Sequence, residues 1–169
     1  MNNKKTNTNW YVITGGPSTG KTTVINMLQE KGYKTTIEHA RHYIDTMRDE
    51  GETVEEIRNN KRKFQLGVLD MQIEQEAEIQ PKDALAYYRF LKLEVDDLLT
   101  KAIQKAHYKK IFILDRLPLI NDYARLENEN DQIKIHRLIT EVYEDLGFPI
   151  VFVPVLPPDE RVEFILNNI

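Results

Sequence analysis

The chain has 169 residues, a length that predicts one domain over residues 1–169 with a core large enough to need no disulfide or structural metal. Its 23 Lys and Arg residues against 27 Asp and Glu residues give a net charge of -4, which argues against a broad binding surface for nucleic acid or an anionic membrane. The absence of cysteine excludes a zinc–thiolate site, an iron–sulfur cluster and a thiol nucleophile, and it favours a reducing cytoplasmic location. The most apolar stretch, residues 146–156, is shorter than the roughly 20 residues that a membrane helix needs.

The first part of the chain has the pattern of a strand, a glycine-rich turn and a helix. Residues 10–13 form a short apolar run, and residues 21–30 have helical composition, with Gly32 as a C-cap. A second short strand over residues 35–38 and a helix over residues 39–48 are predicted next.

The middle of the chain is predicted to be helical. Thr53 followed three positions later by Glu56 is a capping box, and it opens a polar stretch that favours one long helix ending at Pro81. Two amphipathic helices, over residues 83–92 and 95–107, follow.

The last part of the chain alternates strands with helices. Residues 111–114 form an uninterrupted apolar run before Asp115, a pattern typical of a strand that is buried on both faces of a parallel sheet. The elements predicted after it are a polar loop, a helix, a strand and a final helix, at residues 121–131, 133–146, 150–155 and from 157 onward. This alternation predicts an α/β fold with a mostly parallel sheet.

The turn after the first strand matches the phosphate-binding pattern G-x-x-x-x-G-K-[ST]. Its residues are Gly15, Gly16, Pro17, Ser18, Thr19, Gly20, Lys21 and Thr22. Glycine permits backbone conformations in which successive N–H groups point inward, and the following helix N-terminus adds partial positive charge. We therefore expect the N–H groups of residues 16–22 to form an anion site.

The side chains at the end of this motif have separate expected roles. Lys21 is expected to reach the β- and γ-phosphates, the Thr22 hydroxyl to complete the coordination of Mg²⁺, and Thr23 to contact the α-phosphate. The motif thus predicts a purine nucleoside triphosphate bound with Mg²⁺, with ATP preferred and GTP possible.

Other features narrow the class of P-loop protein. No glycine has an aspartate three positions before it, so the D-x-x-G switch of signalling GTPases is absent from the sequence. The chain is also too short to hold both domains of an AAA+ machine. What remains is a small kinase with a three-layer α/β/α P-loop NTPase sandwich, in which an acidic strand end and an arginine-bearing lid accompany the loop.

Five segments spread over nearly the whole chain carry a resemblance to a known family, at residues 12–17, 38–41, 83–89, 122–125 and 160–162. They are similar to segments of the NadR-like AAA domains, small P-loop NTPases that include the ribosylnicotinamide kinase domain of NadR. The resemblance implies a kinase or ATPase whose acceptor is a nucleoside-like or other small hydroxyl compound.

The resemblance also implies roles for three charged residues. Glu38 and Arg41 follow the second predicted strand, at the sheet end where open α/β sheets bind ligands. Glu38 is expected to bind substrate hydroxyls or to act as a base, and Arg41 to clamp a substrate anion or stabilise the transferred phosphoryl group; the alternative is a surface ion pair. Arg125 corresponds to a lid arginine that contacts phosphates, with a solvated acidic loop as the alternative.

Asp115 is the obvious candidate for the carboxylate that holds the hydration shell of Mg²⁺. In the resembling family, however, the strand with this carboxylate precedes the segment that corresponds to residues 83–89, and residues 111–115 correspond to the next strand. Three explanations stay open: the chain omits residues near 80–82, the strand is absent, or Asp115 has taken over its task.

A missing central strand would leave backbone groups unpaired beside the phosphate-loop strand, each at a cost of about 1 to 3 kcal/mol. We therefore expect one of two outcomes. Either the chain is interrupted between about residues 78 and 83, or residues 111–114 lie directly beside residues 11–14. In the second case the Asp115 side chain is expected to point at the Thr22 hydroxyl.

Two functions from different classes follow. The first is a Mg²⁺-dependent kinase or ATPase, for which we expect Lys21, Glu38, Arg41, Asp115 and Arg125 to carry the chemistry. The second is a nucleotide-dependent binding module or switch, in which closure of the lid over a triphosphate gates a protein or lipid partner.

Overall fold

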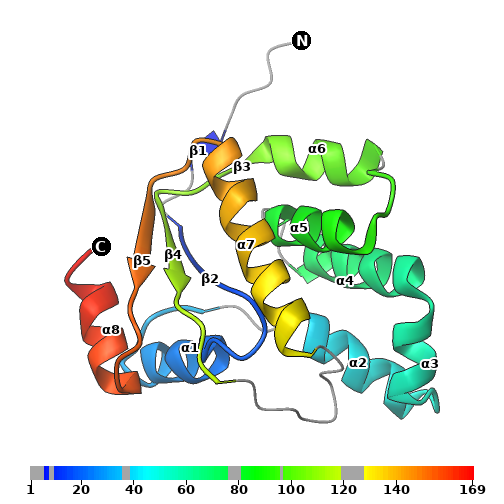
Figure 1. Ribbon diagram of the computed structural model, residues 1–169, viewed down its shortest axis with the longest axis horizontal. Coiled ribbons are helices and arrows are strands. Elements are labelled where there is room, and N and C mark those ends of the chain that lie inside the picture. Colours follow the sequence, from blue (N-terminus) through cyan, green and yellow to red (C-terminus); the bar gives the residue numbers. More distant parts are fainter. Residues whose placement is uncertain (1–5, 8–9, 36–38, 76–80, 96, 119–127) are drawn as a thin grey trace.

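The computed structural model describes residues 6–7, 10–35, 39–75, 81–95, 97–118 and 128–169. In these ranges the structure contains eight helices, a three-stranded sheet and a separate pair of two-residue strands (Figure 1). The separate pair, β1 (Thr6–Asn7) and β3 (Ala106–His107), is parallel.

The three-stranded sheet is parallel throughout. Its strands, in spatial order, are β2 (Tyr11–Thr14), β4 (Lys110–Leu114) and β5 (Ile150–Val153). Thr14 pairs with Ile113, and Leu114 pairs with Val153, so the carboxyl ends of the three strands meet at one edge. The prediction that residues 111–114 lie directly beside the phosphate-loop strand is confirmed.

Alternate residues of β4 serve the two faces of the sheet. Ile111 and Ile113 belong to a core with helices α5 (Pro81–Leu91) and α7 (Glu129–Asp145). Phe112 and Leu114 belong to a core with α1 (Lys21–Glu30) and α8 (Pro158–Leu166). All four strand residues are fully buried, and the fold is the predicted three-layer α/β/α arrangement. Figure 1 shows α1 beside α8 at one end of the molecule, with α7 crossing the sheet.

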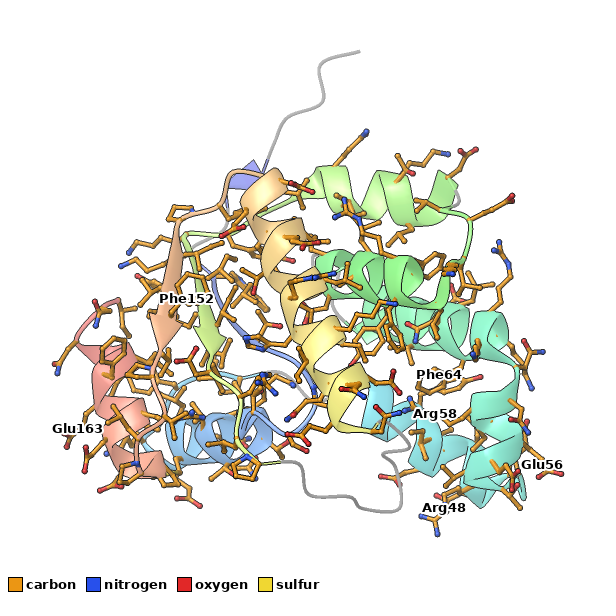
Figure 2. All side chains as sticks on the ribbon, viewed as in Figure 1. Arg48, Glu56, Arg58, Phe64, Phe152 and Glu163 are labelled. Atoms are coloured by element: carbon orange, nitrogen blue, oxygen red, sulfur yellow. The ribbon has the colours of Figure 1, made fainter. Side chains whose placement is uncertain are left out.

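The remaining helices form a mostly helical part beyond α5 and α7. They are α2 (His39–Asp49), α3 (Val54–Asn59), α4 (Lys61–Gln75) and α6 (Asp97–Lys105). The core under α2, α3 and α4 includes Tyr43 and Phe64, whose rings meet edge to face at 5.8 Å. Figure 2 shows Arg58 and Phe64 in this part, far from Glu163 on α8, and the Arg58 guanidinium lies 4.9 Å from the centre of the Phe64 ring.

The capping box predicted at the start of α3 is confirmed. The Thr53 Oγ1 accepts a hydrogen bond from the Glu56 N–H at 3.3 Å, and the Glu56 carboxylate accepts one from the Thr53 N–H at 2.8 Å. The prediction of one long helix from this point is wrong. Asn60 leaves the helical conformation, and its side-chain oxygen accepts from the Lys63 N–H at 3.0 Å, which begins α4.

Three other boundaries differ from prediction. Pro81 begins α5 instead of ending a helix, because the first turn does not need the N–H that proline lacks. The Asn128 side chain accepts from the Asp131 N–H at 2.9 Å and so begins α7 earlier than predicted. Residues 106–107 form β3 instead of a helix end.

Parts of two predictions lie outside the described residues. Thr35 lies outside any strand, while the rest of the predicted strand at residues 36–38 is not described. Residues 78–80, where an interruption of the chain was one of the two expected outcomes, also lie outside the described residues. In the described ranges, no helix is both long enough and apolar enough to cross a membrane.

Candidate phosphate site at the carboxyl edge of the sheet

The glycine-rich turn connects β2 to α1 at the edge where the three strands end. Gly15, Ser18 and Gly20 adopt positive φ values of 147°, 56° and 82°. A Cβ atom on Gly15 would lie 2.9 Å from the Leu114 carbonyl oxygen, so only glycine fits between the turn and β4. The turn then delivers Gly20 to the N-terminus of α1, and the N-terminus of a helix attracts anions.

The Lys21 ammonium lies within this turn. It donates hydrogen bonds to the carbonyl oxygens of Gly15 at 2.9 Å and Gly16 at 2.8 Å. The Thr19 hydroxyl donates to the same Gly16 carbonyl at 3.0 Å. The positive charge of Lys21 is thus held at the centre of the loop.

A cavity of about 220 Å³ opens over the loop. Its lining residues are Ser18, Thr19, Gly20, Lys21, Thr22, Thr23, Leu117 and Pro118. Pockets that enclose a whole small molecule usually measure roughly 300 to 1,000 Å³, so this cavity suits the phosphate part of a ligand. The structure therefore brings the predicted nucleotide-binding residues 18–23 to one cavity, with the segment that follows β4 as its opposite wall.

Helix α7 supports the first half of the loop. The Gln132 side-chain amide donates to the carbonyl oxygens of Pro17 at 2.9 Å and Leu117 at 3.0 Å, and its oxygen accepts from Arg116 at 3.3 Å. One turn later, the His136 Nδ1 accepts from the Gly16 N–H at 3.2 Å.

The contact with His136 bears on the first of the expected N–H donors. The Gly16 N–H donates to His136, and Pro17 has no N–H, so in this structure neither residue offers an N–H to an anion. Burial, with the charges of Arg116 and Lys21, lowers the pKa of His136, although the charge of Asp115 raises it. The neutral ring is the form that can accept at Nδ1.

Arg161 of α8 supports the second half of the loop. Its guanidinium is almost fully buried and donates to three carbonyl oxygens, those of Thr19 at 2.7 Å, Pro154 at 3.0 Å and Asp115 at 3.1 Å. One side chain therefore ties the phosphate loop to the ends of β4 and β5.

Asp83 approaches β2 from the start of α5. Its carboxylate accepts hydrogen bonds from the Thr14 hydroxyl at 2.6 Å and the Tyr143 hydroxyl at 2.7 Å. Burial raises the pKa of Asp83, while these two hydrogen bonds and the charges of Lys21 and Lys82 lower it. A carboxylate thus lies within electrostatic reach of Lys21, next to the last residue of the phosphate-loop strand.

Asp115 follows β4 at the same edge. Its backbone N–H donates to the Val153 carbonyl at 2.9 Å, and its charge acts on His136 and Arg161, which both contact the phosphate loop. The assignment of Thr22 and Asp115 to Mg²⁺ stays a prediction. Among the described residues, no group of three or more His, Asp or Glu side chains gathers as a metal site, and P-loop proteins bind Mg²⁺ largely through phosphates and water.

The other predicted catalytic residues are not tested by the geometry. Glu38 and Arg125 lie outside the described residues. Arg41 belongs to α2, but its side chain is not described. In the segment of α5 that carries the family resemblance, Tyr88 is fully buried and Arg89 pairs with Asp145 on the surface at 3.1 Å.

Four residues of the site were missed by sequence reasoning: Asp83, Gln132, His136 and Arg161. Each contacts the phosphate loop or the strand that enters it, which lies far from it in the sequence, so no local spacing reveals the pairing. Two of them, Asp83 and Arg161, lie in segments that carry the family resemblance, and this was the available signal.

Comparisons with known proteins agree with this architecture. A structure of deoxyadenosine kinase from M. mycoides with the products dCMP and dCDP superposes with a TM-score of 0.63 at 16% identity, over 94% of this chain and 96% of that chain. A structure of the same enzyme with bound dCTP gives a TM-score of 0.63 at 17% identity, over 94% and 97% of the two chains. At this identity the likeness shows a shared fold. Comparison with the curated proteins gives no match. A family model described as an AAA domain matches residues 10–161, and the chain therefore belongs to this AAA domain family.

Proposed function

We propose that this protein is a kinase that binds ATP with Mg²⁺ and transfers the γ-phosphoryl group to a hydroxyl of a small, nucleoside-like acceptor. The observation that carries the proposal is the Lys21 ammonium, held by the Gly15 and Gly16 carbonyls inside a loop that leads into a helix N-terminus. The fold shared with deoxyadenosine kinase supports the choice of acceptor class.

The residues of the loop suit a triphosphate. The N–H groups from Ser18 onward and the Lys21 ammonium are positive groups at a cavity that has the size of a phosphate moiety. The Thr22 hydroxyl and the Asp115 carboxylate would hold Mg²⁺ directly or through water, and this ion would offset charge on the β- and γ-phosphates.

The protein's own part in the transfer is positioning and charge. In this proposal Lys21 stabilises the negative oxygens of the transferred group, and Arg41 and Arg125 add positive charge when the site closes. Glu38 orients the acceptor hydroxyl or accepts its proton as the oxygen attacks phosphorus and ADP leaves. We also propose that residues 1–169 form a single domain and that the protein is cytoplasmic.

The direct test measures ATP consumption by the purified protein against a panel of nucleosides, deoxynucleosides and other small hydroxyl compounds, with ATP hydrolysis alone as the control. Acceptor-dependent formation of ADP and of a phosphorylated acceptor is the expected result. Tight nucleotide binding without turnover on any acceptor would favour the alternative, a nucleotide-dependent binding module.

A variant of Lys21 tests the phosphate site itself. We expect Lys21→Ala to weaken MgATP binding by at least about a hundredfold while the thermal unfolding midpoint stays close to wild type, because the ammonium serves the phosphates and not the core. Calorimetric titration measures the affinity, and Lys31→Ala, an exposed lysine at the other end of α1, is the matched control. Unchanged affinity in folded Lys21→Ala would contradict the assignment.

A further inference from the structure

Two side chains of α7 contact the phosphate loop without any part in the proposed chemistry. Gln132 and His136 are four residues apart, so both lie on one face of the helix. The helix comes very close here, because a Cβ atom on Gly16 would lie 2.9 Å from the His136 Cβ and 3.2 Å from the Gln132 carbonyl oxygen. The close approach prevents the loop from moving toward α7, and the hydrogen bonds prevent it from moving away.

Side chains of the loop and of the start of α1 also hold the first half of the loop. Lys21 holds the Gly15 and Gly16 carbonyls, and Thr19 holds the Gly16 carbonyl. The Lys21 ammonium has three N–H donors, and those that turn from these carbonyls to phosphate oxygens no longer hold the loop. The bond from the Gly16 N–H to His136 does not involve Lys21, so it can persist in the nucleotide complex.

Gln132 joins the two walls of the cavity. The two N–H bonds of its amide point to Pro17 in the loop and to Leu117 in the opposite wall, and its oxygen accepts from Arg116. Gln132 is almost fully buried, so water does not replace these partners easily. Its amide therefore fixes the distance between the loop and the segment that follows β4.

We propose that Gln132 and His136 are positioning residues: they keep residues 16–17 in the shape that binds phosphate after Lys21 has moved to the nucleotide, and they tie this part of the loop to residues 116–117. The inference rests on the proposed nucleotide function for its effect on affinity. The fixation of the loop itself does not depend on that function.

Three variants separate this role from general packing. In Gln132→Glu the carboxylate keeps the bond from Arg116 but has no N–H for Pro17 and Leu117. In His136→Asn the side-chain oxygen is bonded to Cγ, as Nδ1 is in histidine, and it can still accept from the Gly16 N–H. His136→Leu removes the acceptor at similar volume. The matched controls are Gln104→Glu and His42→Asn, which make the same changes at exposed positions.

The first readout is hydrogen exchange of the nucleotide-free protein. We expect Gln132→Glu and His136→Leu to speed amide exchange in residues 14–22 by about tenfold, while His136→Asn and both controls remain close to wild type. The second readout is the dissociation constant of MgATP. We expect the dissociation constant to rise by about five- to tenfold in Gln132→Glu and His136→Leu, while their unfolding midpoints stay within a few degrees of wild type. In His136→Asn we expect the dissociation constant to return most of the way to the wild-type value.

Failure of this inference is distinct from failure of the proposed function. If wild-type protein binds no nucleotide, the proposed function fails, and the exchange experiment still decides whether the two residues fix the loop. Unchanged exchange in both Gln132→Glu and His136→Leu would overturn the positioning role. A rise in the dissociation constant that is equal in His136→Asn and His136→Leu would overturn the part assigned to Nδ1.

Discussion

At the scale of single residues, the start of α5 places two ionisable groups in the interior, where burial acts on them in opposite ways. Asp83 and Lys82 are neighbours at the start of α5, yet their side chains face different surroundings. The Asp83 carboxylate meets the hydroxyls of Thr14 and Tyr143, whereas the Lys82 ammonium lies over aromatic rings. Each group therefore makes its own contribution to the pH dependence of stability.

Asp83 is expected to make the fold less stable as pH rises. Burial raises the pKa of Asp83 in the folded state, so the folded protein holds a proton that the unfolded chain has released. The contribution of Asp83 is fully favourable below the ordinary carboxyl pKa and is lost as pH rises through the folded value. We expect Asp83→Asn to remove this dependence, because an uncharged amide keeps the same shape.

The measurement for Asp83 is the difference in thermal unfolding midpoint between Asp83→Asn and wild type over pH 3 to 8. Taking the difference cancels the opposite trend of other carboxylates. The unfolding midpoint of Asp83→Asn should increase relative to that of wild type as pH rises. A difference that stays constant with pH would show that burial does not perturb Asp83, and Asp145→Asn on the surface is the control.

Lys82 is expected to weaken the fold at neutral pH. Its side chain is 1% exposed, and its ammonium lies 4.2 Å from the centre of the Tyr108 ring and 4.8 Å from that of Phe148. Burial lowers the pKa of Lys82 from 10.5 to about 8, against the charge of Asp83. Such a shift corresponds to about 3 kcal/mol of lost stability below pH 8, and the cation–π contacts offset part of this cost.

We expect Lys82→Met to raise the free energy of unfolding at pH 7 by about 1 to 3 kcal/mol, since methionine fills a similar volume without a charge. The gain should shrink between pH 8 and 10.5, where wild-type Lys82 loses its proton in the fold before it does in the unfolded chain. Urea titrations at pH 7 and pH 10 measure both quantities. A destabilised Lys82→Met at pH 7 would mean that the cation–π contacts outweigh burial.

At the scale of elements, the helical part depends on one close approach. Gly67 lies in the interior of α4, where alanine would ordinarily be preferred by about 1 kcal/mol. A Cβ atom at this position would overlap the Cε2, Cζ and hydroxyl oxygen atoms of the Tyr43 side chain on α2. The packing of α2 on α4 therefore requires glycine here.

We expect Gly67→Ala to destabilise the protein by about 1 to 3 kcal/mol, against the order of helix propensities, because α2 and α4 must separate or Tyr43 must leave its place. Chemical denaturation measures the loss. In the double variant with Tyr43→Ala, the alanine at position 67 should cost nothing further or should stabilise. If the double variant instead loses the sum of the stabilities lost in the two single variants, the contact with Tyr43 is not the cause.

The elements that sequence reasoning located well are those with a continuous local signal. The apolar run at residues 111–114, the capping box at Thr53 and the prolines at the start of α8 all specify structure within a few residues. The break at Asn60 was missed because a single side-chain cap ends one helical pattern and opens another. The contacts of Asp83 and His136 were missed because they depend on which helices the sheet brings to the loop.

At the scale of the whole molecule, the phosphate loop is held from three directions. Helix α7 contacts its first half, α5 contacts the strand that enters it, and α8 contacts its second half through Arg161. Helices α5 and α7 cover one face of the sheet, and α8 covers the other. The shape of the loop therefore depends on the packing of both helical layers against the sheet. Ligand binding should stabilise the three layers together.

Arg161 offers the sharpest test of this coupling, because one buried guanidinium bonds to the loop and to the ends of β4 and β5. We expect Arg161→Met to lower the unfolding midpoint by several degrees and also to weaken the MgATP response. A ligand at a hundred times its dissociation constant stabilises the native state by about 2.7 kcal/mol, so a variant with weaker affinity gains less at the same concentration. Lysine can reach fewer of the three carbonyls, so Arg161→Lys should have an unfolding midpoint and a MgATP response between those of wild type and Arg161→Met.

The measurement is the unfolding midpoint of each protein with and without MgATP at one fixed concentration. The control is Arg137→Met, the same substitution on the exposed face of α7, where Arg137 pairs only with Glu141 among the described ion pairs, at 3.2 Å. Wild type and the control should show equal ligand-induced shifts. If Arg161→Met loses stability but keeps the full shift, Arg161 supports the sheet alone and the second half of the loop holds its shape without it. If both the stability and the shift fall, the carbonyl of Thr19 is the point at which α8 and the phosphate loop are coupled.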